Sequence, residues 1–233
     1  MARVLTEEHT LHRQARWAWA GVAVGWGMVP LAIAGLLWRQ APLLAWALIP
    51  ILVTLAGQWT HRAMATILGY GGERAVDRVL RALPDDYLLF NGLTLWVDGR
   101  QAQLDHVLLS PYGLWCVETK SLRGAVYGTE TEKRWQQVKR SDSGRHYRNA
   151  FYSPVRQNAT HCRRLHAYLL RHGLHVAVRS LIVFTTAELH VRTTTPVIPL
   201  AQLPGVIHAH DTQPQFTSHD VTRIAHALLA SAG

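Results

Sequence analysis

The stretch from Gln103 to Lys120, QLDHVLLSPYGLWCVETK, decides the fold of this 233-residue chain. Two runs rich in apolar residues flank Pro-Tyr-Gly at residues 111–113, a sequence typical of a tight turn, and they predict two antiparallel strands joined as a hairpin. Side chains alternate along a strand, so Glu118 and Lys120 would project from one face. Pairing of the two strands would bring Asp105 beside them.

Residues on the N-terminal side of this hairpin predict a helix and a third strand. The glycine-rich residues 69–72 are expected to break a preceding helix, and Glu73 begins a segment whose apolar residues recur at the spacing of one helix face. Residues 87–95 form an extended run that is followed by the turn sequence Asp98-Gly99. Three consecutive strands with short turns predict an antiparallel meander.

Residues on the C-terminal side complete an α/β pattern. Residues 121–150 are polar and predict irregular structure, with a short hairpin near residues 124–128. Ser153 and Pro154 match the cap and the first position of a helix that Gly173 ends. The remaining predicted elements are a central strand at residues 180–185, a strand near residues 197–200 and a helix at about residues 219–230. The order helix, three strands, helix, strand predicts an α/β fold in which helices flank a mixed sheet.

Two long uncharged runs precede the α/β region. Residues 17–38 and 40–60 contain no charged side chain, and Arg39 alone stands between them. About 20 apolar residues cover the hydrocarbon core of a bilayer, so each run is long enough to span it. We expect two transmembrane helices, at about residues 17–38 and 41–60, with tryptophans near their ends at the level of the headgroups. A cleaved signal peptide and a buried helical pair of a soluble protein are the alternatives.

This interpretation divides the chain into an N-terminal membrane hairpin, residues 1–62, and a second domain, residues 63–233. Within the second domain we expect a core at about residues 66–185 and a C-terminal extension at residues 186–233. Arginines are concentrated before the first uncharged run and after the second, and positively charged flanks face the cytoplasm. The sequence therefore predicts a multi-pass protein of the cell inner membrane whose second domain lies in the cytoplasm.

Composition and short motifs exclude several classes of protein. The apolar fraction of 48% is too high for wholesale disorder. The two cysteines, Cys116 and Cys162, can build neither a disulfide framework nor a Cys-x-x-Cys zinc site, so we expect a reducing compartment and no zinc. The chain has no phosphate-binding P-loop and no Gly-x-Ser-x-Gly elbow. Its formal net charge of +9 favours polyanionic partners.

Acidic residues near the central hairpin indicate a metal site. Asp105, Glu118 and Lys120 would share a small volume, and carboxylate oxygens suit Mg²⁺ or Mn²⁺. Glu73 lies on the apolar stripe of its predicted helix, where a carboxylate turned toward the sheet needs a partner. The lysine could orient a water molecule or neutralise charge on a phosphate. The alternatives are a first-turn acid for Glu73, a strand-end charge or a salt bridge to Lys120 for Asp105, and exposed strand ends for Glu118 and Lys120.

Several short motifs, in this order, resemble those of a known family. They are GYGGE at residues 69–73, QLDHV at 103–107, YGL at 112–114, ETK at 118–120, Gly124, Trp135 and SPVRQ at 153–157. Over about residues 66–185 the chain is similar to the nuclease-related domain (NERD) family, which is related to the PD-(D/E)XK nucleases. One motif departs from the family, because Ser-Pro at residues 153–154 stands where Asn-Pro is usual.

The resemblance implies a restriction-endonuclease-like core of the order α-β-β-β-α-β. It also implies that Asp105 and Glu118 are metal ligands and that Lys120 is the catalytic lysine. Glu73 and Gln157 would complete the catalytic site from the two helices. From the residues alone, Gln157 lies in the first turn of its helix, where it could meet a phosphate or could be an ordinary surface residue.

The region after the hairpin is basic and predicts contact with nucleic acid. From Lys120 to Arg171 there are 12 basic and 3 acidic residues, with aromatic side chains between them. Cations neutralise the phosphate backbone and bases stack on aromatic rings, as binding of single strands or duplex ends requires. A face near anionic lipid is the alternative. The residues that we expect to contact nucleic acid are Lys133, Arg134, Lys139, Arg140, Arg156 and Arg164.

Together these features predict a membrane-anchored nuclease that depends on Mg²⁺ or Mn²⁺ and acts on cytoplasmic DNA or RNA. DNA is the substrate that we expect first. A catalytically inactive module that binds nucleic acid or a partner at the membrane is the alternative, and a surface that contacts only lipid is a third interpretation. The sequence gives no indication of the oligomeric state.

Overall fold

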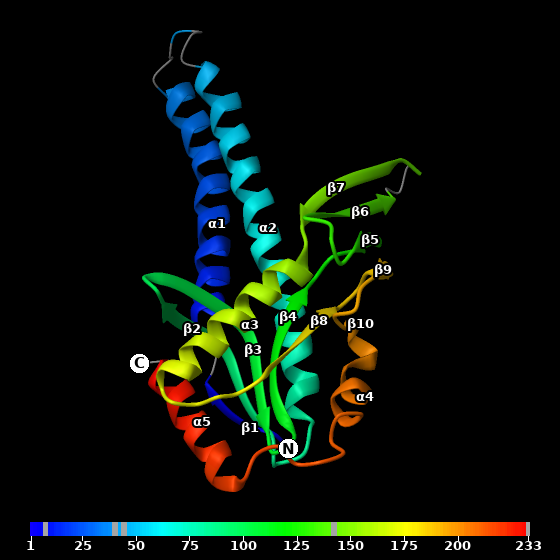
Figure 1. Ribbon diagram of the computed structural model, residues 1–233. Coiled ribbons are helices and arrows are strands. Elements are labelled where there is room, and N and C mark those ends of the chain that lie inside the picture. Colours follow the sequence, from blue (N-terminus) through cyan, green and yellow to red (C-terminus); the bar gives the residue numbers. More distant parts are fainter. Residues whose placement is uncertain (7–8, 39–41, 43–45, 141–143, 232–233) are drawn as a thin grey trace. The chain divides into compact units, whose positions relative to one another are not determined.

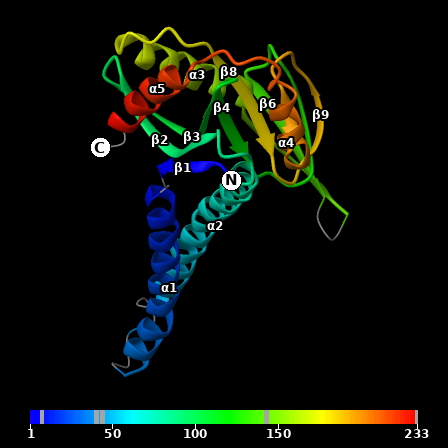
Figure 2. The ribbon, with the colours of Figure 1, turned by 90° about the horizontal axis from the view of Figure 1, so that it is seen from below.

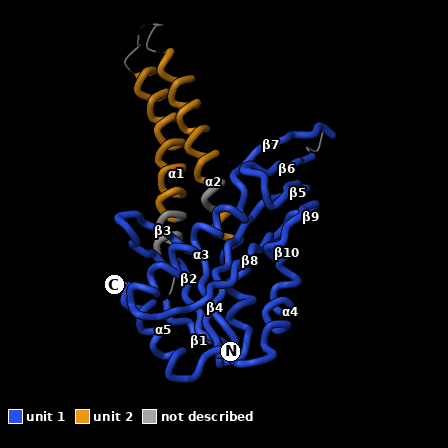
Figure 3. The backbone as a smooth tube through the Cα atoms, in the orientation of Figure 1, with its two compact units in different colours: residues 1–8, 72–233 blue, residues 9–71 orange. Residues whose placement is uncertain are grey.

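The computed structural model describes all residues except 7–8, 39–41, 43–45, 141–143 and 232–233. For residues 9–15, 65–68 and 70 it describes the backbone alone. The chain divides into two compact units, which Figure 3 distinguishes by colour. Unit 1 contains residues 1–8 and 72–233, and unit 2 contains residues 9–71.

Unit 2 is a pair of helices. Helix α1 spans His9–Trp38, and helix α2, Leu48–Arg81, begins in unit 2 and ends in unit 1 (Figure 1). Trp26 Nε1 donates a hydrogen bond to Thr60 Oγ1 at 2.9 Å, and a Cβ atom added to Gly25 would stand 3.6 Å from Ala56 Cβ. Among the described residues one segment, Arg16–Trp38, is long and apolar enough to cross a membrane. The helical pair is thus present, and both of its membrane spans stay predictions.

The expected break at residues 69–72 is wrong, because α2 continues through these glycines to Arg81. A glycine inside a helix costs only about 1 kcal/mol relative to alanine, so glycines weaken a helix without ending it. Gly72 has a reason to lack a side chain: an added Cβ would lie 2.6 Å from Ser121 Cβ. The glycine therefore permits α2 to approach the chain after the third predicted strand.

The main sheet of unit 1 contains the predicted meander. Strands β2 (Leu88–Val97), β3 (Arg100–Ser110) and β4 (Gly113–Lys120) are antiparallel neighbours. Asp98 and Gly99 have φ values of 52° and 69°, so both central residues of the β2–β3 turn adopt the left-handed region typical of tight hairpins. Strand β8 (Val178–Phe184) pairs with β4 in parallel, and β10 (Val197–Pro199) pairs with β8. The α-β-β-β-α-β order is therefore present.

Helices cover both faces of the main sheet. Helices α3 (Pro154–Arg171) and α5 (Ser218–Ala230) lie on one face, as Figure 2 shows, and pack with the strands in one apolar cluster. The end of α2 and the short elements η2 (Leu200–Gln202) and α4 (Leu203–His208) pack on the other face. The helix residues that are fully buried in the two clusters include Leu165, Leu169 and Leu228 in the first, and Val76, Leu80 and Ile207 in the second.

A second sheet occupies much of the region that was expected to be irregular. It consists of β5 (Ala125–Thr129), β6 (Arg134–Arg140), β7 (His146–Tyr152) and β9 (Glu188–Arg192), in the order β7-β6-β5-β9. Figure 1 shows β6 and β7 extending beyond the main sheet. Trp135 is fully buried and anchors the second sheet on Ile182 and Phe184 of β8. The prediction of irregular structure was wrong because only a few buried side chains hold these polar strands in place, and such a small number gives no clear apolar pattern in the sequence.

Strand β1 (Arg3–Thr6) was not predicted and forms an edge of the main sheet. It pairs with β2 in parallel, and Ala2 N donates to Arg81 O at 3.1 Å. Residues on both sides of unit 2 therefore belong to the same compact unit. If α1 crosses a membrane, the chain must cross again before residue 72 for both flanks to reach that unit.

Candidate active site

Strand β4 and helix α3 bring three of the predicted site residues together. Lys120 Nζ lies 2.6 Å from Glu118 Oε1 and 3.0 Å from Gln157 Oε1. Glu118 and Lys120 are two residues apart on β4, so they share the face that α3 covers. Gln157 lies in the first turn of α3, where Ser153 is the N-cap and its hydroxyl accepts the N–H of Arg156. The amine of Lys120 is thus held between a carboxylate and a side-chain amide.

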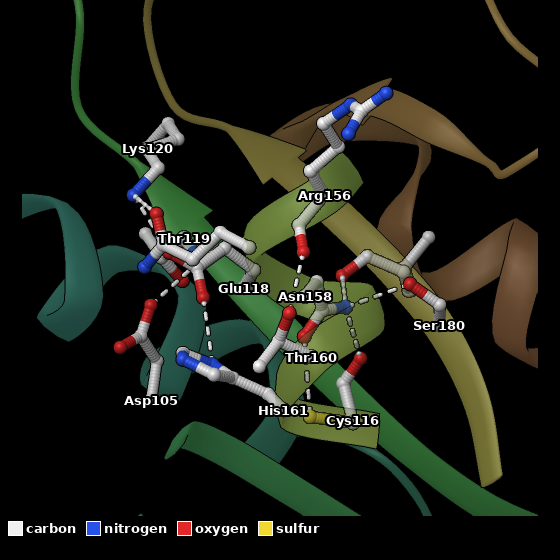
Figure 4. A network of polar contacts seen from close by, with 12 residues as sticks. Asp105, Cys116, Glu118, Thr119, Lys120, Arg156, Asn158, Thr160, His161 and Ser180 are labelled. Atoms are coloured by element: carbon white, nitrogen blue, oxygen red, sulfur yellow. Dashed lines mark hydrogen bonds and ion pairs between the residues drawn. The ribbon is translucent and has the colours of Figure 1, made fainter. Parts of the chain in front are cut away.

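Glu118 is buried and kept ionised. Only 1% of its side chain is exposed, and His161 Nδ1 lies 3.3 Å from its Oε2 atom (Figure 4). Burial acts to raise the pKa of Glu118, but His161 and Lys120 beside it outweigh burial and hold that pKa below its ordinary value. At neutral pH the carboxylate therefore carries its charge inside the protein, where it can bind a cation.

Asp105 enters the site because the strand ladder is interrupted at this residue. The pairing between β2 and β3 skips Asp105 and the residue opposite, Gly92, which has φ 61°. A left-handed φ is easily adopted only by glycine, so Gly92 permits this irregularity. Asp105 Oδ2 accepts the backbone N–H of Thr119 at 2.8 Å, and Thr119 lies between Glu118 and Lys120 (Figure 4).

Glu73 lies on α2, the helix that covers the opposite face of the main sheet. Val76, one turn later on α2, is buried in the cluster on that face. The contact of Gly72 with Ser121 places Glu73 next to the chain directly after Lys120. Its side chain is half-buried. The structure thus places Glu73 near the end of β4, and its part in catalysis stays a prediction.

His161 belongs to this group of residues and was missed by sequence reasoning. It follows Gln157 by four residues on α3, and residues four apart lie on the same helix face. Its side chain is 14% exposed. The spacing to Gln157 was the one signal that could have identified it among 14 histidines.

A buried amide holds α3 against the sheet beside the site. Asn158 is fully buried, and its Nδ2 donates to Cys116 O and Ser180 Oγ, both at 2.9 Å, and to Leu181 O at 3.2 Å. These partners lie on β4 and β8, so the amide joins three elements, as Figure 4 shows. Asn158 directly follows Gln157 in the sequence. It therefore sets where the first turn of α3 meets Lys120.

The donor atoms of the site fit a divalent cation. Glu118 Oε2 and His161 Nδ1 are buried, and neither has a hydrogen-bond partner among the residues that the structure describes. Asp105 carries a carboxylate on the neighbouring strand β3, held by the backbone N–H of Thr119, and Mg²⁺ usually needs only one or two carboxylates besides water and substrate phosphate. In the described part of the chain, no group of three His, Cys, Asp or Glu side chains is assembled to hold a metal ion. A cation held by Glu118 and His161 alone would therefore need water or phosphate to complete its coordination.

Four of the predicted nucleic-acid contacts lie on an exposed arm formed by β6 and β7, which we call the basic arm. Successive cross-strand pairs of β6 and β7 point alternately to the two faces of the arm. The pair Trp135–Phe151 points to the inner face, which packs on β8, and the pairs on either side of it point to the outer face. The outer face carries Arg134, Arg140, His146, Arg148 and Tyr152. Lys139 pairs with Tyr147 on the other face, and Lys133 directly precedes β6. Strand pairing thus gathers three arginines on one surface.

The other two predicted contacts lie on α3 and separate from each other. Arg156 donates to Thr131 O at 3.0 Å, in the turn between β5 and β6, so it lies at the base of the basic arm. Arg164 donates to Gln101 O at 3.0 Å, near the β2–β3 turn. The two arginines are eight positions apart, which corresponds to roughly 12 Å along a helix. Arg164 therefore lies apart from the other five cations.

Comparison with known proteins gives one family match. The model of the nuclease-related domain family matches residues 68–185, about half of the chain. The chain belongs to the NERD family. An uncharacterized protein of Bacillus anthracis is 34% identical over 96 residues, which cover 40% of this chain and 42% of that protein. The alignment thus spans less than half of the relative, and no solved structure gives a significant match.

The NERD match confirms the resemblance drawn from the sequence motifs. It contains all five predicted catalytic residues and the whole basic arm. Strands β1, β9 and β10 and helices α4 and α5 lie outside it. The NERD segment of this protein is therefore completed by elements from both ends of unit 1.

Proposed function

We propose that this NERD protein is a nuclease that uses Mg²⁺ or Mn²⁺ to hydrolyse phosphodiester bonds of nucleic acid, DNA first, and that helices α1 and α2 hold it at a membrane. The observation that supports the proposal most is the group of Glu118, Lys120 and Gln157. An ionised, buried carboxylate lies beside an amine that a helix amide restrains. Charges that are positioned in advance in a partly dry site stabilise a transition state more than mobile ones do.

Each residue has a role that follows from its contacts. Glu118 and Asp105 would hold the cation, which when bound polarises a phosphate and activates a water molecule. Lys120 is 23% exposed, so its amine can reach substrate phosphate oxygens while it still donates to Glu118. Gln157 accepts one of the three ammonium protons and so restricts the direction of the other two. The lysine would neutralise the charge that develops on the phosphate.

The basic arm supports nucleic acid as the substrate. Its outer face carries three arginines, and Tyr152 on the same face is 46% exposed. Arginine pairs with phosphate through a planar fork of donors, and an exposed ring offers a surface on which a base stacks. Because Arg156 joins the base of the arm to the first turn of α3, a strand bound along the arm would lead toward Gln157.

Cleavage assays on the full chain in lipid nanodiscs test this proposal. Plasmid, linear and single-stranded DNA and RNA are incubated with Mg²⁺ or Mn²⁺, and we expect turnover that Glu118→Gln and Lys120→Met abolish. Glu188→Gln, which alters an exposed acid on β9, is the matched control and should retain turnover. If the wild type and the Lys120→Met variant cleave equally, Lys120 has no catalytic role. Salt-sensitive DNA binding without cleavage by any form would favour the inactive binding module.

The apolar segment Arg16–Trp38 supports attachment to a membrane. Because residues 1–8 and 72–233 form one unit, we expect both ends of the chain on the same side of the membrane. The positively charged flanks favour the cytoplasmic side of the inner membrane, and two spans at about residues 17–38 and 41–60 would return the chain to that side. Reporters fused to either end in separate strains measure on which side of the membrane each end lies. Activity of a periplasm-specific reporter at one end and a cytoplasm-specific reporter at the other would contradict it.

A further inference from the structure

We propose that His161 is a direct ligand of the cation through Nδ1 and that it gives this site a preference for first-row transition-metal ions, such as Mn²⁺, over Mg²⁺. The inference rests on the proposed function, in which Glu118 holds a divalent ion. It adds a residue that neither the sequence motifs nor the family resemblance assigned. It also names the class of ion that the site selects.

The positions of two buried atoms carry the inference. His161 Nδ1 and Glu118 Oε2 face each other at 3.3 Å, and neither has a hydrogen-bond partner in the part of the chain that the structure describes. Buried polar atoms are normally hydrogen-bonded, so two facing atoms that make only an ion-pair contact with each other leave room for a shared partner. Lys120 occupies the other oxygen of Glu118, Oε1, and leaves Oε2 directed at the imidazole. A cation between the two atoms would satisfy both at once.

The separation fits two ligands of one ion. Bonds of about 2.0–2.2 Å to nitrogen and oxygen, at angles from octahedral to tetrahedral, place two ligand atoms roughly 2.8–3.6 Å apart. The observed 3.3 Å lies in this range and slightly beyond the usual N–H···O range of about 2.7–3.2 Å. The two atoms are therefore at the separation of two ligands of one ion, and the backbone would not have to move for an ion to bind between them.

The elements that carry the two residues make the spacing rigid. Glu118 is an interior residue of β4, which has a strand on each side, and His161 lies in the second turn of α3. Asn158, three residues before His161, joins α3 to Cys116 O on the same strand as Glu118. Because this hydrogen bond joins β4 to α3 close to both ligands, it limits how far Glu118 Oε2 and His161 Nδ1 can move apart.

The chemistry of the ligand atoms sets the preference between ions. Mg²⁺ is a hard ion that takes oxygen ligands and keeps several waters. Imidazole nitrogen binds first-row transition ions better, and affinities of mixed nitrogen and oxygen sites rise along that series from Mn²⁺. A site of two carboxylates alone would discriminate weakly between Mg²⁺ and Mn²⁺. Addition of His161 to Glu118 would shift the balance toward Mn²⁺.

Electron spin echo spectroscopy of bound Mn²⁺ tests the inference on the full chain in nanodiscs. A directly coordinated imidazole produces ¹⁴N modulation on the Mn²⁺ signal, which changes to a ¹⁵N pattern when the protein is grown with ¹⁵N-labelled histidine. We expect this modulation in the wild type, its loss in His161→Gln, and its retention in His166→Gln. His166 is a matched control because it lies on the same helix and its Nδ1 contacts Val176 O at 2.8 Å instead.

Competition between the two ions provides a second measurement. We expect Mn²⁺ affinity to fall at least about tenfold in His161→Gln, because loss of an outer partner alone changes metal affinity about 10–100-fold. Mg²⁺ affinity should change less, so the preference for Mn²⁺ should shrink. His166→Gln should leave both affinities unchanged.

The outcomes separate this inference from the proposed function. Mn²⁺ that is lost in Glu118→Gln but shows no histidine nitrogen coupling in the labelled wild type would overturn the role of His161 and leave the metal-dependent nuclease standing. Nitrogen coupling that persists in His161→Gln would also overturn it. Absence of any binding of Mn²⁺ or Mg²⁺ that depends on Glu118 would overturn both proposals.

Discussion

Replacement of Asn158 by alanine should destabilise unit 1 more than any other single polar truncation near the site. The side-chain amide is fully buried, donates to acceptors on β4 and β8, and accepts Cys116 Sγ at 3.2 Å. Because Asn158 joins the helix to two strands, its loss should affect the contact between α3 and the sheet first.

The magnitude follows from these contacts. A buried neutral hydrogen bond contributes about 1 kcal/mol, and a buried polar group left without its partner costs about 1–3 kcal/mol. The amide has two protons and serves three acceptors, so we expect Asn158→Ala to lower the free energy of unfolding by roughly 2–4 kcal/mol. Asn158→Asp retains the shape but directs oxygen atoms at those acceptors. The buried carboxylate would keep only the weak thiol donor of Cys116 and the hydroxyl of Ser180 and would face two carbonyl oxygens, so this variant should be at least as unstable.

Urea unfolding of the full chain in detergent measures this, with amide hydrogen exchange of β4 and β8 peptides as the local readout. Asn149→Ala, the same truncation at an exposed position of β7, is the control and should change the unfolding free energy by less than about 0.5 kcal/mol. If Asn158→Asp is as stable as the wild type, the amide protons do not hold α3 on the sheet. In that case Asn158 would not position Gln157 either.

Three further predictions concern other parts of unit 1. Gly128→Ala would place a Cβ 2.3 Å from the fully buried indole of Trp135, so it should lower the free energy of unfolding by about 1–3 kcal/mol and weaken DNA binding by the basic arm. Gly205→Ala is the control, because an added Cβ there would meet nothing within 4 Å, and it should have neither effect. Equal DNA binding by the two variants would contradict this prediction. Burial and a hydrogen bond to a carboxylate raise the pKa of Tyr87, so the folded state retains a proton that the unfolded state releases above pH 10. Stability should therefore fall above pH 10 by about 1.4 kcal/mol per pH unit more in the wild type than in Tyr87→Phe, and parallel pH profiles from alkaline unfolding would refute this. Deletion of residues 2–6 removes β1, so the amides of β2 that face it should exchange with solvent at least about tenfold faster; unchanged exchange would show that β1 does not protect this edge.

Local patterns predicted much of unit 1. The strands at residues 88–120 and the helix from Pro154 were predicted because alternation, turn residues and an N-cap are properties of neighbouring residues. Glu118 and Lys120 share a face for the same reason. The second sheet has no such pattern, because β5 pairs with β9 some sixty residues later, and the pairing depends on one buried tryptophan, Trp135.

In the site, too, some residues could be predicted from local patterns and others could not. Glu118 and Lys120 were candidates because of their spacing on one strand, and the family motifs added Gln157. Asn158 could not be chosen, since one asparagine on a helix has no distinguishing neighbours in sequence, and His161 differed from the other 13 histidines only by its spacing to Gln157. Their importance comes from distances of about 3 Å to atoms on β4 and β8.

Local sequence patterns were enough to predict the order of the core elements, the shared face of Glu118 and Lys120, and the apolar segment before them. These depend on periodicity and turn chemistry, which act over a few residues. Tertiary structure alone decided that β1 joins the sheet, that three arginines share one face of the basic arm, and that His161 meets Glu118. Such contacts join residues far apart in the chain, and they exist only after the sheet and α3 have packed together.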